Sequence, residues 1–196
     1  MSEAGLEQKY VKEAFDTNWV VPMGPNVNAF EKDLENFVNS CAPLRQVQSA
    51  EPETTTASSK QATELLDRKV VCLSAGTAAV HLALIGCGVK AGDEVLVQSY
   101  TFCASSHPIT YLGAHPVFVG SEGETWNMDP VLLEKAILDR KAKTGRCPKA
   151  IVPVALYGMP YRIDEIMAIA DRYGIPVVED AAEGMGSRFN GPVLGT

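Results

Sequence analysis

The sequence predicts an α/β domain, built on a mostly parallel sheet with helices on both faces. From residue 70 onward, short runs of valine, isoleucine and leucine alternate with longer amphipathic stretches. The short runs are apolar throughout, as expected of strands that are buried on both faces. Glycine, proline and Asp-Pro signals separate the runs and mark where helices begin and end.

Two helices are expected before this alternating region. Apolar residues recur at spacings of three and four in residues 7–18 and again in 26–40, and the turn "WVVPMGPN" at 19–26 separates them. Residues 41–69 are polar, with Ser/Thr runs and no apolar period, which is typical of a loop or a disordered insertion. We therefore divide the chain into an N-terminal helical segment at 1–40, a polar insertion at 41–69 and a large domain at 70–196.

The large domain is expected to contain five strands, four helices and a closing hairpin in alternating order. The strands are predicted at 69–73, 93–98, 115–120, 149–158 and 175–180, the helices at 76–89, 102–113, 131–143 and 165–174, and the hairpin at 187–195.

Several single residues predict where these elements begin, bend or end. Asp129 followed by Pro130 is a strong helix start, and Asp164 is expected to cap the last helix, which Gly174 would end. Pro108 is expected to bend the second helix or to delay its start. Asn190 and Gly191 are typical of a two-residue hairpin turn.

Composition narrows the class of protein. The chain has 196 residues, an apolar fraction of 46% and a net charge of −7, with a pI near 5.0. These values fit an acidic globular domain and argue against a surface for nucleic acid or anionic membranes. The N-terminus has no apolar signal core, and none of the five cysteines forms a CxxC pair, so we expect a cytoplasmic protein with reduced thiols and without a metal site.

In a parallel sheet, ligands bind at the carboxyl ends of the strands. The first predicted strand ends in "LSAGT", which leads directly into a helix. Gly76 lets a ligand approach the backbone closely, the free amides of the first turn attract an anion, and Thr77 adds a hydroxyl. The pattern matches neither a P-loop nor a dinucleotide fingerprint. The alternative is an ordinary capped helix start.

Two other strand ends carry candidates. Tyr100 and Phe102 follow the second strand, where an aromatic side chain could cover a bound ring or simply pack in the core, and Thr101 could be a helix cap. Glu179 and Asp180 end the fifth strand, and alternation places them on opposite faces, so they are not expected to act as a catalytic pair. Asp180 could hold a protonated pyridine nitrogen, or it could cap the following turn.

A phosphate cup, an aromatic cover and one acid together indicate a pyridoxal phosphate pocket. In this combination the chain resembles the DegT-type sugar aminotransferases, a fold-type I family. The matching stretches begin at "TNWVVPMGPNVNAFEKDL", continue through "LSAGTAAVHLALIGCGVKAGDEVLVQSYTFCASSHPITYLGAHPVFV" and "IVPVALYGMPYRIDEIMAIADRYGIPVVEDAAEGMGS", and close at "GPVLGT". The resemblance covers almost the whole chain except the insertion at about 41–69.

The resemblance implies a role for each matched position. Gly76 and Thr77 would hold the cofactor phosphate, Phe102 would stack on the pyridine ring, and Asp180 would pair with the ring nitrogen. Glu183 stands where the family often has Gln or His near the ring hydroxyl, and Ala155 stands where many members carry His. The loop 19–26 resembles a segment beside the sugar-nucleotide site of the family's dimers.

The resemblance also implies a reaction: transfer of an amino group, usually from glutamate, to a nucleotide-linked keto-sugar in amino-sugar biosynthesis. The Schiff-base lysine of the family is expected after Thr196. No lysine follows Lys149, which precedes the fourth strand at the opposite end of the sheet. On its own, the 196-residue chain is therefore expected to form a truncated large domain without activity. The complete protein is expected to be a homodimer.

Three alternatives remain open at the level of the sequence. The chain could be a non-catalytic fragment that binds a cofactor, a nucleotide sugar or a full-length partner. It could be a plain nucleotide-binding α/β domain, although the absent fingerprints argue against that. It could also belong to the lysine-free dehydratases of the same family, in which His replaces the lysine.

Overall fold

A computed structural model describes residues 5–41, 68–191 and 193–195. The chain divides into two compact units. The described part of the first consists of residues 5–41 and 68–72, and that of the second of residues 73–191 and 193–195. Most of the expected insertion at 41–69 therefore lies outside the described residues.

The first unit contains the two helices that the apolar spacing predicts. Helix α1 spans Leu6–Asp16 and helix α2 spans Pro25–Ser40, with Gly24 and Pro25 at the start of α2. No residue of α1 is buried, and Val38 is the only buried residue of α2. The two helices thus form with most of their apolar side chains exposed.

The prediction of a strand at 69–73 is wrong. The segment forms no strand, and its amides bond to carboxylates of α2 instead: Cys72 N donates to Glu31 Oε1 at 2.8 Å, and Val70 N donates to Glu35 Oε1 at 3.5 Å. Val71 is 67% exposed. A short apolar run resembles a strand locally, but here side-chain acceptors take the amides that a neighbouring strand would need.

The second unit is built around a parallel sheet, as the alternation predicts. Strand β1 spans Glu94–Gln98 and lies between β2 at His115–Val119 and β3 at Ala150–Val152, parallel to both. Residues 176–180 continue the sheet beyond β3 through parallel bridges rather than a regular strand. Val178 N donates to Ile151 O at 2.9 Å, and Asp180 N donates to Pro153 O at 3.0 Å. The predicted fourth strand is therefore shortened to β3, and isolated bridges replace the predicted fifth strand at 175–180, since Pro153 and Pro176 have no N–H for the ladder.

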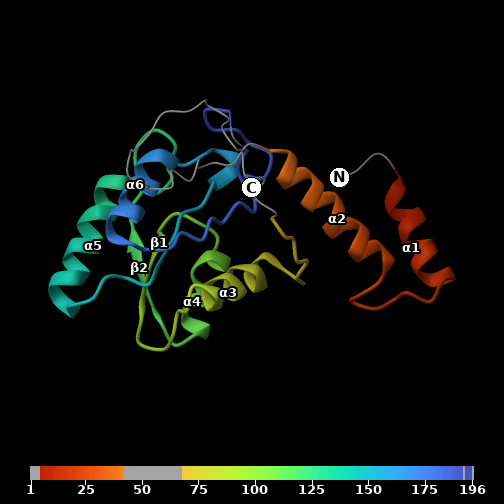
Figure 1. The fold of residues 1–196 in the computed structure, drawn as a ribbon, viewed down its shortest axis with the longest axis horizontal. Coiled ribbons are helices and arrows are strands. Elements are labelled where there is room, and N and C mark those ends of the chain that lie inside the picture. The colour runs from red at the N-terminus through yellow and green to blue at the C-terminus, as the bar shows by residue number, and fades with distance from the viewer. Residues whose placement is uncertain (1–4, 42–67, 192, 196) are drawn as a thin grey trace, which may run out of the picture. The chain divides into compact units, whose positions relative to one another are not determined.

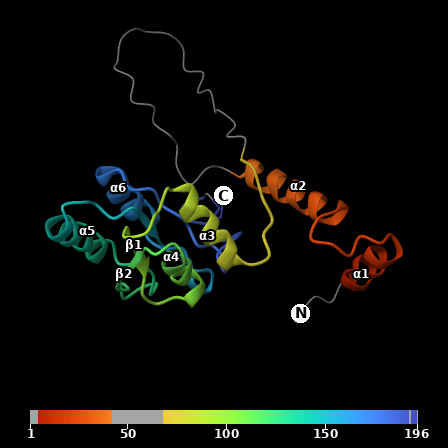
Figure 2. The ribbon, with the colours of Figure 1, turned by 90° about the horizontal axis from the view of Figure 1, so that it is seen from below.

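Helices cover both faces of this sheet (Figures 1 and 2). On one face lie α3 at Gly76–Gly86 and α4 at His107–Tyr111, whose core includes Leu84 and Ile109. On the other lie α5 at Pro130–Thr144 and α6 at Ile163–Tyr173. Alternate side chains of β1 pack on opposite faces of the sheet. Val95 and Val97 pack in the core with α3 and α4, and Leu96 packs in the core with α5 and α6.

Helix ends follow the sequence signals with one exception. Asp129 caps α5, because its Oδ1 accepts from Val131 N at 2.7 Å and Leu132 N at 3.2 Å. Gly174 ends α6 with a left-handed φ of 65°. The expected cap at Asp164 is wrong: α6 begins at Ile163 after Arg162, so Asp164 lies inside the first turn without a capping bond.

The predicted helix at 102–113 is divided in two. A 3-10 turn, η1, spans Cys103–Ser105, and α4 begins only at His107, with Pro108 in its first turn. The late start allowed for at Pro108 is thus confirmed. The closing hairpin is also present: Arg188 and Val193 form an antiparallel bridge, and Asn190 and Gly191 both have positive φ.

Candidate functional site

Asp180 lies at the carboxyl end of the sheet, where residues 176–180 run beside β3. Its Oδ2 accepts a hydrogen bond from Ser105 Oγ at 2.6 Å, and its Oδ1 accepts one from Ala182 N at 3.2 Å. The carboxylate is partly exposed. Both of its oxygens are therefore held in place, while the group remains accessible to a ligand at this edge of the sheet.

The N-terminus of α3 is open. Built on the backbone, a Cβ at Gly76 would meet no atom within 4 Å, and Ala75, which precedes the helix, provides no side-chain cap. The first hydrogen bonds of the helix are those of Ala78 N and Ala79 N to Ala75 O. The amides of Gly76 and Thr77 precede these bonds, so that the predicted anion site at the start of α3 is open.

Two aromatic side chains stand out after β1. Phe102 is 76% exposed, and the 3-10 turn η1 begins directly after it. Tyr100 is half exposed, with its ring centroid 6.0 Å from that of Trp126. Neither side chain is buried, so the alternative of core packing is wrong for both. Thr101 does not cap a helix; its Oγ1 lies 2.9 Å from Ser105 Oγ.

Glu183 is exposed, and its Oε2 accepts the backbone N–H of Tyr157. Tyr157 has a φ of 53°, in the left-handed region. The pKa of the Tyr157 hydroxyl is raised, chiefly by its interactions with Tyr100 and further by burial and by the charge of Glu183. The carboxylate of Glu183 therefore holds a strained turn at the carboxyl end of the sheet.

Ala155 is fully buried against Gly184, where a built Cβ would come within 2.5 Å of the Ala155 Cβ. Ala155 and Gly184 are therefore a matched close contact, and Ala155 N donates to Asp180 O at 3.1 Å.

Glu179 points away from Asp180, as the alternation predicts. Its Oε2 accepts from Gly195 N at 3.0 Å, and its Oε1 has no hydrogen-bond partner among the described residues. Burial raises the pKa of Glu179, although the Gly195 N–H acts in the opposite direction. Burial and the neighbouring Glu179 also raise the pKa of Tyr161. Glu179 thus belongs to the core beneath the carboxyl edge and not to the ligand side.

Sequence reasoning missed the buried amide pair that supports this edge. Gln98 and Asn127 are fully buried, and Gln98 Nε2 donates to Asn127 Oδ1 at 3.2 Å and to Tyr100 O at 2.9 Å. Gln98 Oε1 accepts from Met128 N, and Asn127 Oδ1 accepts from Leu156 N. The signal in the sequence was Gln98, a polar residue at the end of an apolar strand. The pair fixes the loops that follow three strands.

The opposite edge of the sheet has a different chemistry. Lys149 N donates to Glu94 O at 2.7 Å, beside the start of β3, so the lysine lies at the amino end as expected. A cavity of about 270 Å³ opens there, lined by residues that include Lys149, Arg146 and Asp93. Arg140 forms a bidentate pair with Glu94, with Nε–Oε2 at 3.0 Å and Nη2–Oε1 at 2.7 Å. Ion pairs thus satisfy the acids at this edge.

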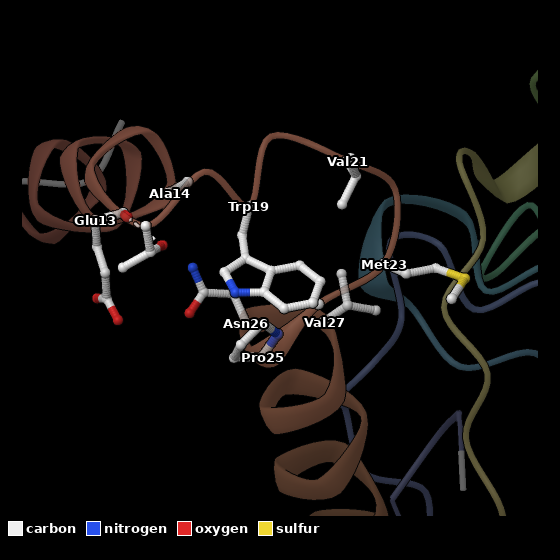
Figure 3. Close-up of a pocket in the computed structure, with 10 residues that line it drawn as sticks. Glu13, Ala14, Trp19, Val21, Met23, Pro25, Asn26 and Val27 are labelled. Atoms are coloured by element: carbon white, nitrogen blue, oxygen red, sulfur yellow. Dashed lines mark hydrogen bonds between the residues drawn. The ribbon is translucent and has the colours of Figure 1, made fainter.

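The first unit contains a small pocket of its own, of about 80 Å³, in the loop 19–26 (Figure 3). Trp19 lies across the start of α2 beside Asn26 and Val27. Gly24 allows this approach, because a Cβ there would lie 3.0 Å from Trp19 Cε3. The loop is therefore ordered by a tryptophan packed on a glycine.

Residues 5–41, 68–191 and 193–195 contain neither a metal-binding cluster nor a membrane-spanning helix. Within these ranges, no group of three or more His, Cys, Asp or Glu side chains is placed to hold a metal ion. No helix in the described parts of the chain is long and apolar enough to cross a membrane.

The residues at the carboxyl edge fit pyridoxal phosphate. The fit rests on the open space above the amides of Gly76 and Thr77, an exposed aromatic ring at Phe102, and a carboxylate at Asp180 whose two oxygens are oriented by donors. These three features suit a phosphate, a flat ring and a protonated ring nitrogen.

Comparison with curated proteins gives relatives along most of the chain. EpsN of Bacillus subtilis is 42% identical over 98% of this chain, and a GDP-perosamine synthase of Escherichia coli O157:H7 is 35% identical over 100% of this chain. A UDP-2-acetamido-2-deoxy-3-oxo-D-glucuronate aminotransferase of Pseudomonas aeruginosa is 42% identical over 67% of it. The chain spans 42%, 44% and 37% of these three relatives, which is less than half of each.

Solved structures agree with these relatives. An aminotransferase from Brucella abortus superposes with a TM-score of 0.74 at 28% identity, covering 93% of this chain and 42% of the other. NtdA of Bacillus subtilis, solved with bound pyridoxamine phosphate, gives 0.70 at 26% identity, covering 95% and 35%. The fold expected from the sequence, an incomplete large domain of fold type I, is thereby confirmed. Residues 46–196 match the model of the DegT/DnrJ/EryC1/StrS aminotransferase family, and the chain belongs to that family.

Proposed function

We propose that this chain is the cofactor-binding part of a pyridoxal phosphate-dependent aminotransferase that acts on a nucleotide-linked keto-sugar, with glutamate as the amino donor. The observation that carries the proposal is Asp180, a carboxylate fixed by Ser105 and Ala182 at the carboxyl edge of a parallel sheet. The cofactor is the one that family members bind.

Each predicted site residue has a role in this proposal. The amides of Gly76 and Thr77, with the Thr77 hydroxyl, bind the phosphate, and Phe102 covers one face of the ring. Asp180 holds the proton on the pyridine nitrogen. When bound, the cofactor supplies an electron sink for the bonds at the amino-bearing carbon. Glu183 stays on the Tyr157 amide and adds a negative charge beside the ring hydroxyl.

The relatives support the class of substrate. One is named for a UDP-linked 3-oxo sugar and another for GDP-perosamine, so nucleotide-linked sugars recur among them. We carry the class over to this chain without choosing the nucleotide, the sugar or the carbon that is aminated. The amino donor, glutamate, comes from the family resemblance alone.

Residues 1–196 contain no lysine after Lys149, and Lys149 lies at the amino edge of the sheet, away from Asp180. We therefore propose that this chain alone does not turn over substrate. A covalently bound cofactor and release of 2-oxoglutarate both require a lysine from outside these residues.

A cytoplasmic homodimer completes the proposal. Leu6, Tyr10, Val11 and Phe15 of α1 are each at least half exposed, and exposed apolar side chains at this density favour a covering surface. Sedimentation velocity of the protein purified from its native gene measures the association, and a monomer at high concentration would contradict the dimer.

Turnover tests the proposed function. The 196-residue chain and the product purified from the native gene are each incubated with pyridoxal phosphate, glutamate and UDP- or GDP-linked keto-sugars. We expect 2-oxoglutarate from a product that supplies the lysine and none from the 196-residue chain. Turnover by the short chain would overturn its predicted inactivity. A lysine-containing product that binds the cofactor but aminates none of the keto-sugars would overturn the substrate class.

A further inference from the structure

Ser105 is a residue of the carboxyl edge that no pattern in the sequence singled out. It is 1% exposed, and its hydroxyl donates to Asp180 Oδ2 at 2.6 Å, across 75 residues of sequence. A second hydroxyl follows: Thr101 Oγ1 lies 2.9 Å from Ser105 Oγ. Since the only hydrogen on Ser105 Oγ is directed at the carboxylate, Thr101 is the donor in that second bond.

The arrangement forms a short relay of hydroxyls that ends on one carboxylate oxygen. A hydroxyl that accepts a hydrogen bond becomes a stronger donor, so Thr101 strengthens the bond from Ser105 to Asp180. The other oxygen of Asp180 accepts the Ala182 N–H at 3.2 Å. The two donors thus fix the rotation of the carboxylate.

The same turn positions the aromatic side chain. η1 begins directly after Phe102, and Ser105 N donates to Phe102 O at 3.2 Å. Phe102 is exposed, whereas Ser105, three residues later, is buried and aimed at Asp180. One turn of chain therefore couples the ring that would cover the cofactor to the acid that would pair with it.

We propose that Ser105 is a positioning residue for Asp180: its hydroxyl, supported by Thr101, orients the charged carboxylate toward the pyridine nitrogen of the bound cofactor. This inference rests on the proposed function, because it concerns the same cofactor. Loss of the hydroxyl leaves Asp180 Oδ2 without its donor, so the carboxylate becomes free to rotate and less able to keep a proton on the ring nitrogen.

The test uses the 196-residue chain and pyridoxal phosphate labelled with ¹⁵N in the ring. Fluorescence titration gives the dissociation constant, and the ¹⁵N chemical shift reports protonation of the ring nitrogen. Ser105→Ala is compared with Ser106→Ala, a neighbouring hydroxyl that bonds to Cys103 O at 3.3 Å instead. We expect Ser105→Ala to weaken binding roughly three- to tenfold, as loss of a charge-assisted hydrogen bond does, and to move the ¹⁵N shift toward unprotonated nitrogen. Ser106→Ala should change neither value.

Further variants separate the outcomes. Should Ser105→Ala fail to fold, Thr101→Val, which removes the relay hydroxyl at constant size, is expected to shift the ¹⁵N signal in the same direction by less, and Thr101→Ser to restore it. Asp180→Asn serves as the reference, because it should move the ¹⁵N signal. If it does, and the folded Ser105 and Thr101 variants keep the wild-type shift, the role of Ser105 is overturned. A wild-type chain that binds no pyridoxal phosphate would overturn the proposed function, and this inference with it.

Discussion

The two edges of the sheet hold their carboxylates in different ways. At the amino edge, Glu94 is paired in a bidentate contact with Arg140, and Asp93 lies 3.8 Å from Arg146. At the carboxyl edge, Asp180 is held by a serine hydroxyl and a backbone amide. A carboxylate paired with a cation is already satisfied, whereas one oriented by neutral donors keeps its charge for a ligand.

The difference follows from how parallel sheets are connected. Helices that follow a strand begin at its carboxyl edge, so that edge collects helix N-termini such as that of α4, which follows β1. The amino edge receives helix C-termini and, in this chain, surface ion pairs. The comparison predicts that equivalent changes at the two edges affect different properties.

Removing one charge at each edge should give the largest contrast. Asp180→Asn is expected to weaken binding of pyridoxal phosphate at least tenfold, about 1.4 kcal/mol or more, because the ring nitrogen loses its charged partner. Asp93→Asn, at the amino edge, should leave the dissociation constant unchanged. Fluorescence titration of both variants measures the effect, and equal loss in the two would show that general charge, not position, controls binding.

The two ends of α3 allow a subtler contrast within one helix. A built Cβ meets nothing within 4 Å at Gly76, at its start, or at Gly86, at its end. Gly76→Ala and Gly86→Ala should therefore both fold, each with stability within about 1 kcal/mol of wild type. The Gly76 variant alone should bind pyridoxal phosphate severalfold more weakly, since its methyl group occupies the space above the amides.

Urea denaturation and cofactor titration of the two variants provide the measurements. Weaker binding by Gly86→Ala to the same extent would show that the effect travels through the helix as a whole. Unchanged binding by Gly76→Ala would show that the phosphate does not bind at the start of α3, and Phe102 and Asp180 would remain as the support for the pocket.

Local patterns predicted the elements of the second unit because the signals act over a few residues. Asp129 and Pro130 began α5, and Gly174 ended α6, as expected. The failed strand at 69–73 involves partners far along the chain. The amide of Cys72 bonds to Glu31, 41 residues away, so a run that resembled a strand was not one.

The residues of the candidate site also differ in whether a local pattern could predict them. Asp180 was predicted from its place at the end of an apolar run, because the rule for parallel sheets needs only the order of elements. Ser105 was missed because its bond to Asp180 depends on how η1 crosses the edge of the sheet, which no local pattern reports. Gly184 was missed because its close contact with Ala155 is visible only in three dimensions.

Glu179 offers the smallest and most specific test, since it neighbours Asp180 yet faces the core. Burial raises its pKa above the ordinary value of 4.5. The folded state therefore binds the proton more tightly than the unfolded state, and the stability contributed by Glu179 is complete below about pH 4.5 and is lost as pH rises through the folded pKa. Glu179→Gln keeps an acceptor for the Gly195 N–H but cannot ionise.

Relative to wild type, Glu179→Gln should gain stability as pH rises from 4.5 to 7, as measured by urea denaturation at several pH values. Asp164→Asn, which removes one exposed charge in the first turn of α6, controls for the change in net charge. A stability difference between Glu179→Gln and wild type that stays constant with pH would show that Glu179 ionises as readily in the folded chain as in the unfolded one. The two adjacent acids would then differ in direction alone. A rising difference would show that the fold suppresses the charge of Glu179, the acid that lies beside Asp180 but faces the core.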